Sequence, residues 1–179
     1  CCPVHIEIHI EPFFVEGFMP KSRKLHGERK VSFLNEGFFT SAGTPVNQLV
    51  PYADYDLRFS VHFEEEVSQV AFVVHVYTVE STNITGRIVP GRHKRIATVG
   101  QGKMYDVVLP FATRLVPGVY LVRLVVQGEL NGVIAPVAVL QDALAFRVLE
   151  ADEAESHITP VALFGSPRAL LAEGSDAQT

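Results

Sequence analysis

The sequence predicts an all-β protein built as an antiparallel two-sheet β-sandwich, and three observations support this fold class. Apolar and polar side chains alternate over several segments, which is the period of two expected of half-buried strands. About eight such short segments follow one another, and turn residues separate them. Helix signals are confined to the last residues of the chain. Short strands at this spacing are typical of immunoglobulin-like and jelly-roll sandwiches.

Alternation defines the strands in the first half of the chain. Its clearest case is 54–63, where every second residue is Tyr, Leu, Phe or Val and the residues between them are polar. One face of this strand is expected to lie in the core and the other in water. The same rule predicts a first strand from Val4 to Phe13. Shorter extended segments are predicted at 31–34, 47–50, 70–79 and 84–89.

Three further strands are predicted in the second half, at 104–111, 118–127 and 143–149. Turn residues separate them at 114–118 and at 128–132. The middle strand is apolar on both faces, so we expect it to lie centrally in a sheet or to be covered on its outer side.

The length of 179 residues fits one domain with a single core, and we expect the sandwich to span 1–165. An acidic hinge at 150–155 and one more strand at 158–164 are predicted after the last long strand. A strand beyond a hinge can exchange between protomers. Ser166 and Pro167 predict the start of a short helical turn, and the residues to 179 form a frayed tail.

Charge and hydropathy exclude two classes of partner. The formal net charge is −5 and the basic residues are scattered, so we expect no nucleic-acid binding. The basic stretches 21–30 and 87–95 are interpreted as solvated loops. Every apolar run is too short to cross a bilayer as a helix, so no membrane span is predicted.

The cysteines bear on the compartment and on how the chain begins. Cys1 and Cys2 are adjacent, so they form no disulfide framework, and a reducing compartment is the simpler interpretation. A chain that begins with cysteine is expected to be processed or excised from a longer one, and we favour excision. The alternative is a lipid-anchored protein outside the cytoplasm.

The sequence contains no familiar catalytic motif: no nucleophile elbow, no phosphate-binding loop and no zinc-protease pattern. Glu64 and Glu66 are spaced like a carboxylate pair, but they lie in an acidic loop with nothing to perturb them. His5 and His9 stand roughly 13 Å apart on a strand, too far to share one metal ion. We therefore expect no enzyme activity, no catalytic residue, no metal and no cofactor.

Several pieces of the sequence occur in an order that resembles a known family. They are the alternating strand 55–63, the strand 70–77 with its turn into 84–86, the turn and strand 115–121, and the segment 142–148. This order is similar to that of the C-terminal domain of Wzt, the nucleotide-binding subunit of ABC transporters that export O-antigen polysaccharide. The resemblance covers roughly 43–148.

The resemblance implies an immunoglobulin-like, non-catalytic carbohydrate-binding domain that recognises the non-reducing end of the finished polysaccharide before export. It implies a cytoplasmic location, at the inner membrane through the transporter, with the polysaccharide and the transporter subunits as partners. Such domains are often homodimers formed by strand exchange. An ATPase domain would precede residue 1.

If a glycan is the ligand, the alternation supplies candidate binding residues on a wet sheet face. His75 and Tyr77 face outward on the strand 70–79, Arg123 on 118–127 and Arg147 on 143–149, and these strands are expected to be neighbours in one sheet. Tyr77 is expected to stack on a sugar ring. The histidine and the two arginines are expected to donate to hydroxyls or to an acidic substituent.

Two other function classes remain open. The first is a protein–protein interaction or assembly module without glycan binding, whose outer apolar row of Val73, Leu121 and Val125 meets another protein. The second is a β-sandwich enzyme or its accessory domain, which needs a titratable pair in a pocket that the sequence does not reveal.

Overall fold

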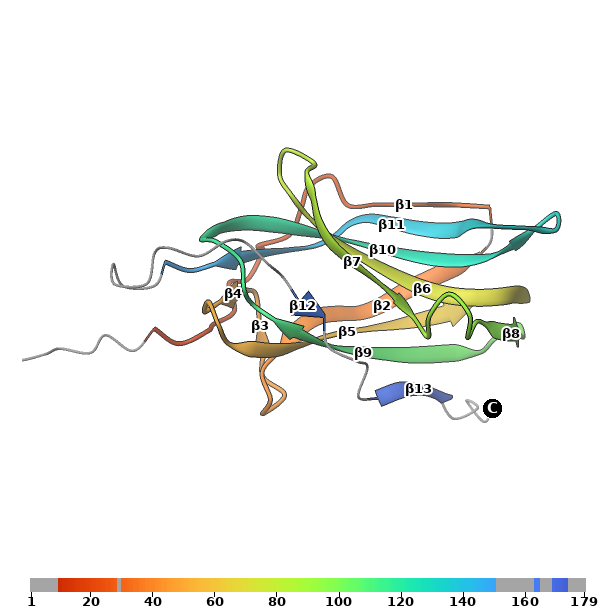
Figure 1. Ribbon diagram of the computed structural model, residues 1–179, viewed down its shortest axis with the longest axis horizontal. Coiled ribbons are helices and arrows are strands. Elements are labelled where there is room, and N and C mark those ends of the chain that lie inside the picture. The colour runs from red at the N-terminus through yellow and green to blue at the C-terminus, as the bar shows by residue number, and fades with distance from the viewer. Residues whose placement is uncertain (1–9, 29, 151–162, 165–168, 174–179) are drawn as a thin grey trace, which may run out of the picture.

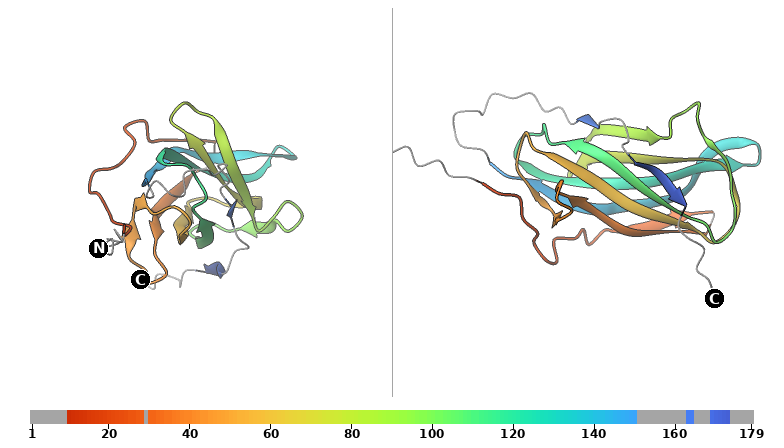
Figure 2. Two further views of the ribbon diagram at one scale, coloured as in Figure 1. Left: turned by 60° about the vertical axis from the view of Figure 1, so that its left-hand side comes forward. Right: turned by 90° about the horizontal axis from the view of Figure 1, so that it is seen from below.

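Two β-sheets face each other in the computed structural model, which describes residues 10–28, 30–150, 163–164 and 169–173 (Figures 1 and 2). Sheet A has seven strands: β1 (Lys24–Gly27), β4 (Gln48–Leu49), β6 (Val67–Thr78), β7 (Asn83–Val89), β8 (Ile96–Val99), β10 (Gly118–Leu130) and β11 (Val133–Val148). Sheet B has six: β2 (Val31–Phe39), β3 (Pro45–Val46), β5 (Asp54–Phe63), β9 (Met104–Ala112), β12 (Leu163–Phe164) and β13 (Ala169–Glu173).

The strand order is β1-β11-β10-β6-β7 in sheet A and β12-β9-β5-β2-β3 in sheet B. Off these paths, β4 pairs with β11, β8 with β6, and β13 with β9. Among the described strands, all pairs are antiparallel except β4 with β11. The predicted all-β two-sheet sandwich is therefore confirmed.

The core lies between the sheets, where the inner rows of the alternating strands meet. Phe59 and Phe72, one from each sheet, are 2% and 1% exposed, and their ring centroids are 6.4 Å apart. At the other end, the ring of Phe38 lies 5.1 Å from that of Phe111 and 4.8 Å from that of Phe146. Tilted and edge-on contacts between such large rings account for much of the apolar burial.

The β10–β11 hairpin is longer than predicted. The connection expected at 128–132 is reduced to a two-residue turn, because β10 extends to Leu130 and β11 already begins at Val133. Asn131 and Gly132 both have positive φ, of 53° and 81°, as a tight hairpin turn requires. The predicted strand begins at 143, ten residues after the start of β11; Pro136 and the alanines near it give the residues before 143 a weak β pattern.

Two strands of sheet A arise from segments without alternation. β1 lies in the basic stretch predicted to be a loop, and β8 was not predicted at all. All four residues of β1 are exposed, yet its backbone pairs with residues 138–141 of β11. The free edge of β11 thus supplies a strand partner to a segment that has no strand signal of its own.

The chain ends differ from the prediction where they are described. Residues 4–9 of the predicted first strand lie outside the described part, 10–12 form no strand, and Phe13 makes one isolated bridge to Gln48. The helical turn predicted from Pro167 is wrong at Ala169–Glu173, which is β13 paired with β9, because an open strand edge outweighs weak helix propensity. β12 falls within the strand predicted at 158–164; most of that segment and hinge residues 151–155 lie outside the described part.

Residues 10–23 form an arm that leads into β1. Figure 2 (left) shows the arm passing along one open edge of the sandwich, outside both layers. No helix in the described ranges is long and apolar enough to cross a bilayer.

Candidate ligand-binding face of sheet A

The strand order places the four predicted binding residues on one face. β11, β10 and β6 are consecutive in sheet A, which confirms the expected neighbourhood of these strands. Arg123 stands directly opposite His75, and Tyr77 stands opposite Leu121, next along the same row. Arg147 pairs with Val119, two rungs away from Arg123 on the same side of the sheet. The face therefore carries a row of polar side chains drawn from three strands.

Tyr77 does not lie on an open surface as expected. Its side chain is only 4% exposed, and the guanidinium of Arg123 lies over its ring at 5.1 Å from the centroid. The hydroxyl donates a hydrogen bond to Asp142, and Gln141 Nε2 donates to the hydroxyl oxygen at 2.8 Å. Because the ring is already covered, its expected stacking on a sugar is corrected: the tyrosine supports the arginine above it.

A bulge in β11 brings Gln141 and Asp142 into this network. The register of β10 on β11 shifts between Val122 and Leu124, and Asp142 has a positive φ of 51°. Gln141 Oε1 accepts from Arg123 Nε at 2.6 Å, and Gln141 Nε2 donates to Asp142 Oδ1 at 2.7 Å. The bulge therefore places Gln141 so that it fixes the guanidinium of Arg123 above the ring of Tyr77.

Asp142 is the buried charge of the network. Burial acts to raise its pKa, but hydrogen bonds from Ser22 of the arm, Tyr77 and Gln141 and the charge of Arg123 outweigh it, so the pKa lies below its usual value. The carboxylate in turn raises the pKa of Tyr77, although burial is the larger cause there. Asp142 is thus an ionised acceptor held inside the network by Tyr77, Gln141 and Ser22.

Sequence reasoning missed Gln141 and Asp142, because the predicted strand began just after them. One signal was present in the sequence. The pair interrupts the apolar run from Val137 to Leu149, and an acid inside such a run is expected to be buried with a partner.

His75 is half-buried beside Arg123. Its pKa is lowered, first by burial and second by the charge of the arginine, so the ring is neutral at physiological pH. Gly86 of β7 faces it across the strand pair, and a Cβ there would stand 2.9 Å from His75 Nδ1. The glycine leaves room for the imidazole on the outer face.

Arg147 is exposed at one end of the face. Its guanidinium lies 5.8 Å from the ring centroid of Phe18, which belongs to the arm. It also borders a depression of about 520 Å³, lined by Pro117, Gly118, Val119, Arg147, Val148, Leu149 and Glu150. This volume falls within the roughly 300 to 1,000 Å³ typical of small-molecule sites.

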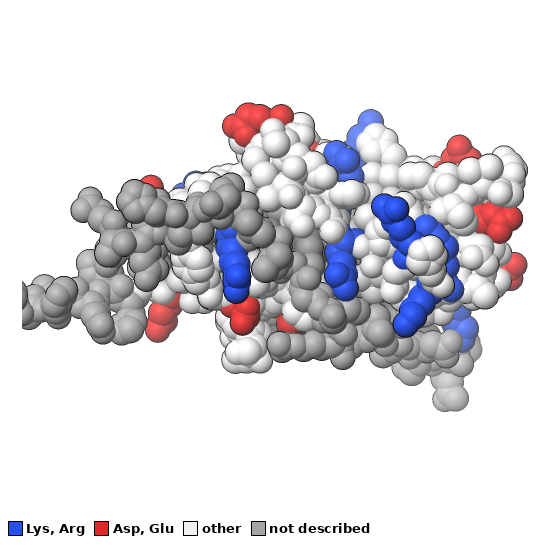
Figure 3. All heavy atoms as spheres, viewed as in Figure 1, with Lys and Arg blue, Asp and Glu red and all other residues white. Residues whose placement is uncertain are grey.

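The basic side chains of the stretch 87–95 have other surroundings. On the face seen in Figure 3, Lys and Arg gather mainly toward the end where β8 lies in Figure 1. Arg92 and Lys94 are exposed there, as predicted for a solvated loop. Arg95 instead donates to the backbone oxygen of Gln69 at 3.2 Å and to Gln127 Oε1 at 2.7 Å, which fixes the loop to sheet A.

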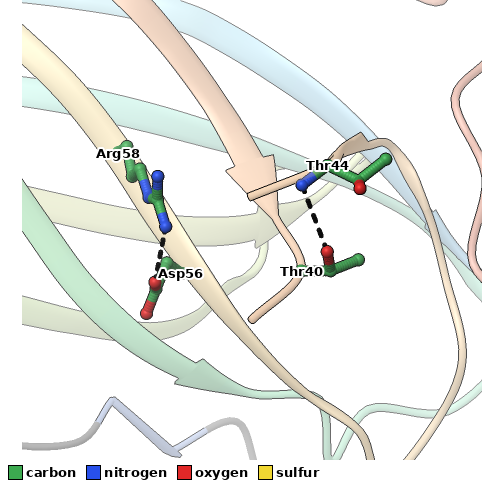
Figure 4. A network of polar contacts seen from close by, with 4 residues as sticks. All are labelled: Thr40, Thr44, Asp56 and Arg58. Carbon is green, nitrogen blue, oxygen red and sulfur yellow. Dashed lines mark hydrogen bonds and ion pairs between the residues drawn. The ribbon is translucent and has the colours of Figure 1, made fainter. Parts of the chain in front are cut away.

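The outer face of sheet B holds a second polar cluster (Figure 4). Arg58 contacts Asp56 on the same strand at 3.0 Å and lies over the ring of Phe39 at 4.9 Å. A cavity of about 290 Å³ nearby is lined by Asp54, Asp56 and Ser41 among others. Within the described ranges, no three His, Cys, Asp or Glu side chains are grouped to hold a metal ion.

Comparison with known proteins places the chain in a family. The family model described as the Wzt C-terminal domain matches residues 22–161. The chain belongs to the Wzt C-terminal domain family. The fold is also similar to a solved structure described as the crystal structure of the C-terminal domain of wzt, with a TM-score of 0.66 and 14% identity, over 75% of this chain and 82% of that one. A search of curated proteins finds no match.

The match clarifies which parts of this Wzt C-terminal domain belong to the family pattern. It extends the predicted resemblance of 43–148 at both ends, and it includes His75, Tyr77, Arg123 and Arg147. The first part of the arm, residues 10–21, lies before the matched region.

Proposed function

We propose that this domain is a non-catalytic carbohydrate-binding domain that recognises the non-reducing end of an O-antigen polysaccharide for export by an ABC transporter. Membership of the Wzt C-terminal domain family supports this role. The observation that carries the proposal is the network on sheet A, where Gln141 holds the partly exposed Arg123 over the ring of Tyr77. Such a fixed guanidinium loses little freedom when it binds a ligand.

The ligand is expected to contact the row formed by His75, Arg123 and Arg147. The two guanidinium groups donate to sugar hydroxyls or to an acidic substituent of the terminal sugar. The imidazole of His75 accepts or donates one hydrogen bond beside them. Tyr77 takes part indirectly, because its hydroxyl is engaged by Asp142 and its ring supports Arg123.

The partners in this proposal are the polysaccharide and the transporter subunits, and the location is cytoplasmic, at the inner membrane through the transporter. A homodimer is part of the proposal. β12 and β13 pair with β9 of the same chain, and a strand held at such an edge can make the same pairs in a second copy.

The assembly-module alternative receives less support from the outer apolar row of sheet A. Val73 and Val125 are 4% and 7% exposed, so little of this row is left to meet another protein. Leu121 is half-buried.

Isothermal titration of the full chain with delipidated O-polysaccharide from its source organism tests the proposal. Arg123→Ala is expected to weaken binding by roughly tenfold or more, since a charged hydrogen-bond donor is lost. The matched control is Arg92→Ala, an exposed arginine of the basic loop, which should bind like the unaltered chain. Absence of binding by the unaltered chain, or equal affinity of a folded Arg123→Ala variant, contradicts the proposal.

A further inference from the structure

The arm and the open edge of the sandwich enclose a cleft of about 320 Å³ that none of the predicted binding residues lines. We call it the edge cleft. The arm contributes Phe14, Phe18 and Met19, β2 contributes Asn35 and Glu36, and β11 contributes Ala145 among the lining residues. The volume lies at the lower end of the range for small-molecule sites.

Two residues of β11, Leu144 and Ala145, line this cleft. Along its outer edge, β11 pairs with β1 at residues 138–141 and with β4 at 147–148. Between these two partners, residues 142–146 have no strand partner on that side within the described part of the chain. An unpaired strand edge presents N–H and C=O groups ready to bond. The edge cleft therefore offers backbone hydrogen bonds as well as apolar walls.

The arm wall of the edge cleft is fixed by specific hydrogen bonds. The side chain of Asn47 accepts from Val15 N at 2.8 Å and donates to Val15 O at 2.9 Å. Asn47 is itself 7% exposed, so this clamp is shielded from water. Further along, Arg23 of the arm hydrogen-bonds Glu36 at the bulge of β2. These hydrogen bonds hold the arm wall against the sandwich.

The aromatic rings of the arm are partly open to solvent. The ring of Phe14 is 57% exposed, and the neighbouring apolar side chain of Met19 is 49% exposed. Both side chains line the edge cleft. An aromatic face next to carboxylate, amide and backbone groups is suited to the apolar face and the hydroxyls of a sugar ring. β1 and β4 close the unpaired edge at both ends, so an added peptide strand cannot continue through it.

One contact links the edge cleft to the proposed binding face. Phe18 lines the cleft, and its ring lies beneath the guanidinium of Arg147 at 5.8 Å. Resting on the function proposed above, we propose that the edge cleft is a second subsite that binds a further sugar ring of the same polysaccharide. Phe14 and Phe18 lie before the region matched by the family model, whereas the β2 and β11 residues of the cleft lie within it.

Titrations with O-polysaccharide fragments of increasing length test the subsite, using the full chain. Phe14→Ala is expected to weaken binding of multi-repeat fragments by roughly three- to tenfold, the loss of one ring contact, without weakening the shortest fragment that binds. The matched control is Phe13→Ala, because Phe13 is 50% exposed on the same arm but does not line the cleft. It should leave all affinities unchanged.

Backbone amide NMR of the unaltered chain separates the two proposals. Multi-repeat fragments should shift the amide signals of Ala143 and Ala145 together with those around Arg123. Shifts around Arg123 alone, or unchanged affinities of a folded Phe14→Ala variant, overturn the subsite and leave the proposed function intact. A third outcome also overturns the subsite. If Phe14→Ala leaves the glycan affinity unaltered but changes how the apparent mass of the protein depends on its concentration, the cleft is a contact between two copies of the chain. No binding of any fragment contradicts the proposed function itself.

Discussion

The outer faces of the two sheets have the same sequence signature but are organised differently. On sheet B, Arg58 pairs with Asp56 two residues away on the same strand, and Ser60 donates to Asp106 of the neighbouring strand. On sheet A, Tyr77 donates to Asp142, which is 65 residues away, and Asp142 also accepts from Ser22 of the arm outside the sheet. Alternation therefore tells which side chains face outward, whereas the function of a face depends on how many elements contribute to it.

The burial of the carboxylates separates the faces further. Asp142 is 7% exposed and accepts from several donors, while Asp106 on sheet B is exposed and accepts from Ser60. Pairs in water contribute little to stability, but removal of one member of a buried network leaves its partners unsatisfied. Three measurements sharpen this comparison, in order of decreasing effect.

The largest effect is expected for Asp142→Ala, which removes the acceptor of the Tyr77 hydroxyl and one of the two acceptors of Gln141 Nε2, and leaves Arg123 without its nearby charge. We expect the free energy of unfolding to fall by about 2 to 4 kcal/mol in urea titrations. Asp106→Ala, the control on sheet B, should cost about 1 kcal/mol or less. Asp142→Asn tolerates the positive φ and keeps one acceptor, so it should lie between them. Equal losses for the two alanine variants would remove the distinction between the faces.

A smaller effect is expected from pH, because the pKa of His75 in the folded chain lies below its unfolded value. The unfolded chain then takes up the proton first, so the contribution to stability is present above about pH 6.5 and is lost as pH falls through the folded pKa. Unfolding titrations between about pH 7.5 and pH 5 should show less loss of stability in His75→Gln than in the unaltered chain. His62→Gln, on the outer row of β5, is the control on sheet B. If the free energy of unfolding depends on pH equally in His75→Gln and in the unaltered chain, the lowered pKa of His75 is contradicted.

The smallest effect is expected for Arg58→Ala. This side chain is partly exposed and pairs with Asp56 on the surface, so its removal should lower the free energy of unfolding by roughly 0.5 to 1 kcal/mol, including its contact with Phe39. Glycan affinity should not change, since the residue lies on the other sheet. A loss of affinity as large as that of Arg123→Ala would move the binding face to sheet B.

Much of the fold could be predicted because the strands carry their own signal. The inward row of β5 and the burial of Phe72 and Tyr120 follow directly from alternation and are confirmed. β1 could not be predicted, since its four residues are all exposed and only the free edge of β11 makes them a strand. The strand β13 could not be predicted either. Its local sequence favours a helical turn, and it becomes a strand only by pairing with the edge of β9, which is far away in sequence.

The candidate site was predictable only in part. The outward position of His75 beside Arg123 follows from two periodic strands that become neighbours. The burial of Tyr77 and the roles of Gln141 and Asp142 do not follow, because they depend on a bulge within β11.

The sequence alone determined the fold class and the side of each long strand that faces water, since a period of two is a local property of the chain. The tertiary structure decided which strands are neighbours, where the register shifts, and what the arm covers. Those features depend on contacts between residues far apart in sequence, and their energies come from cross-strand packing and shared hydrogen bonds that no local pattern encodes.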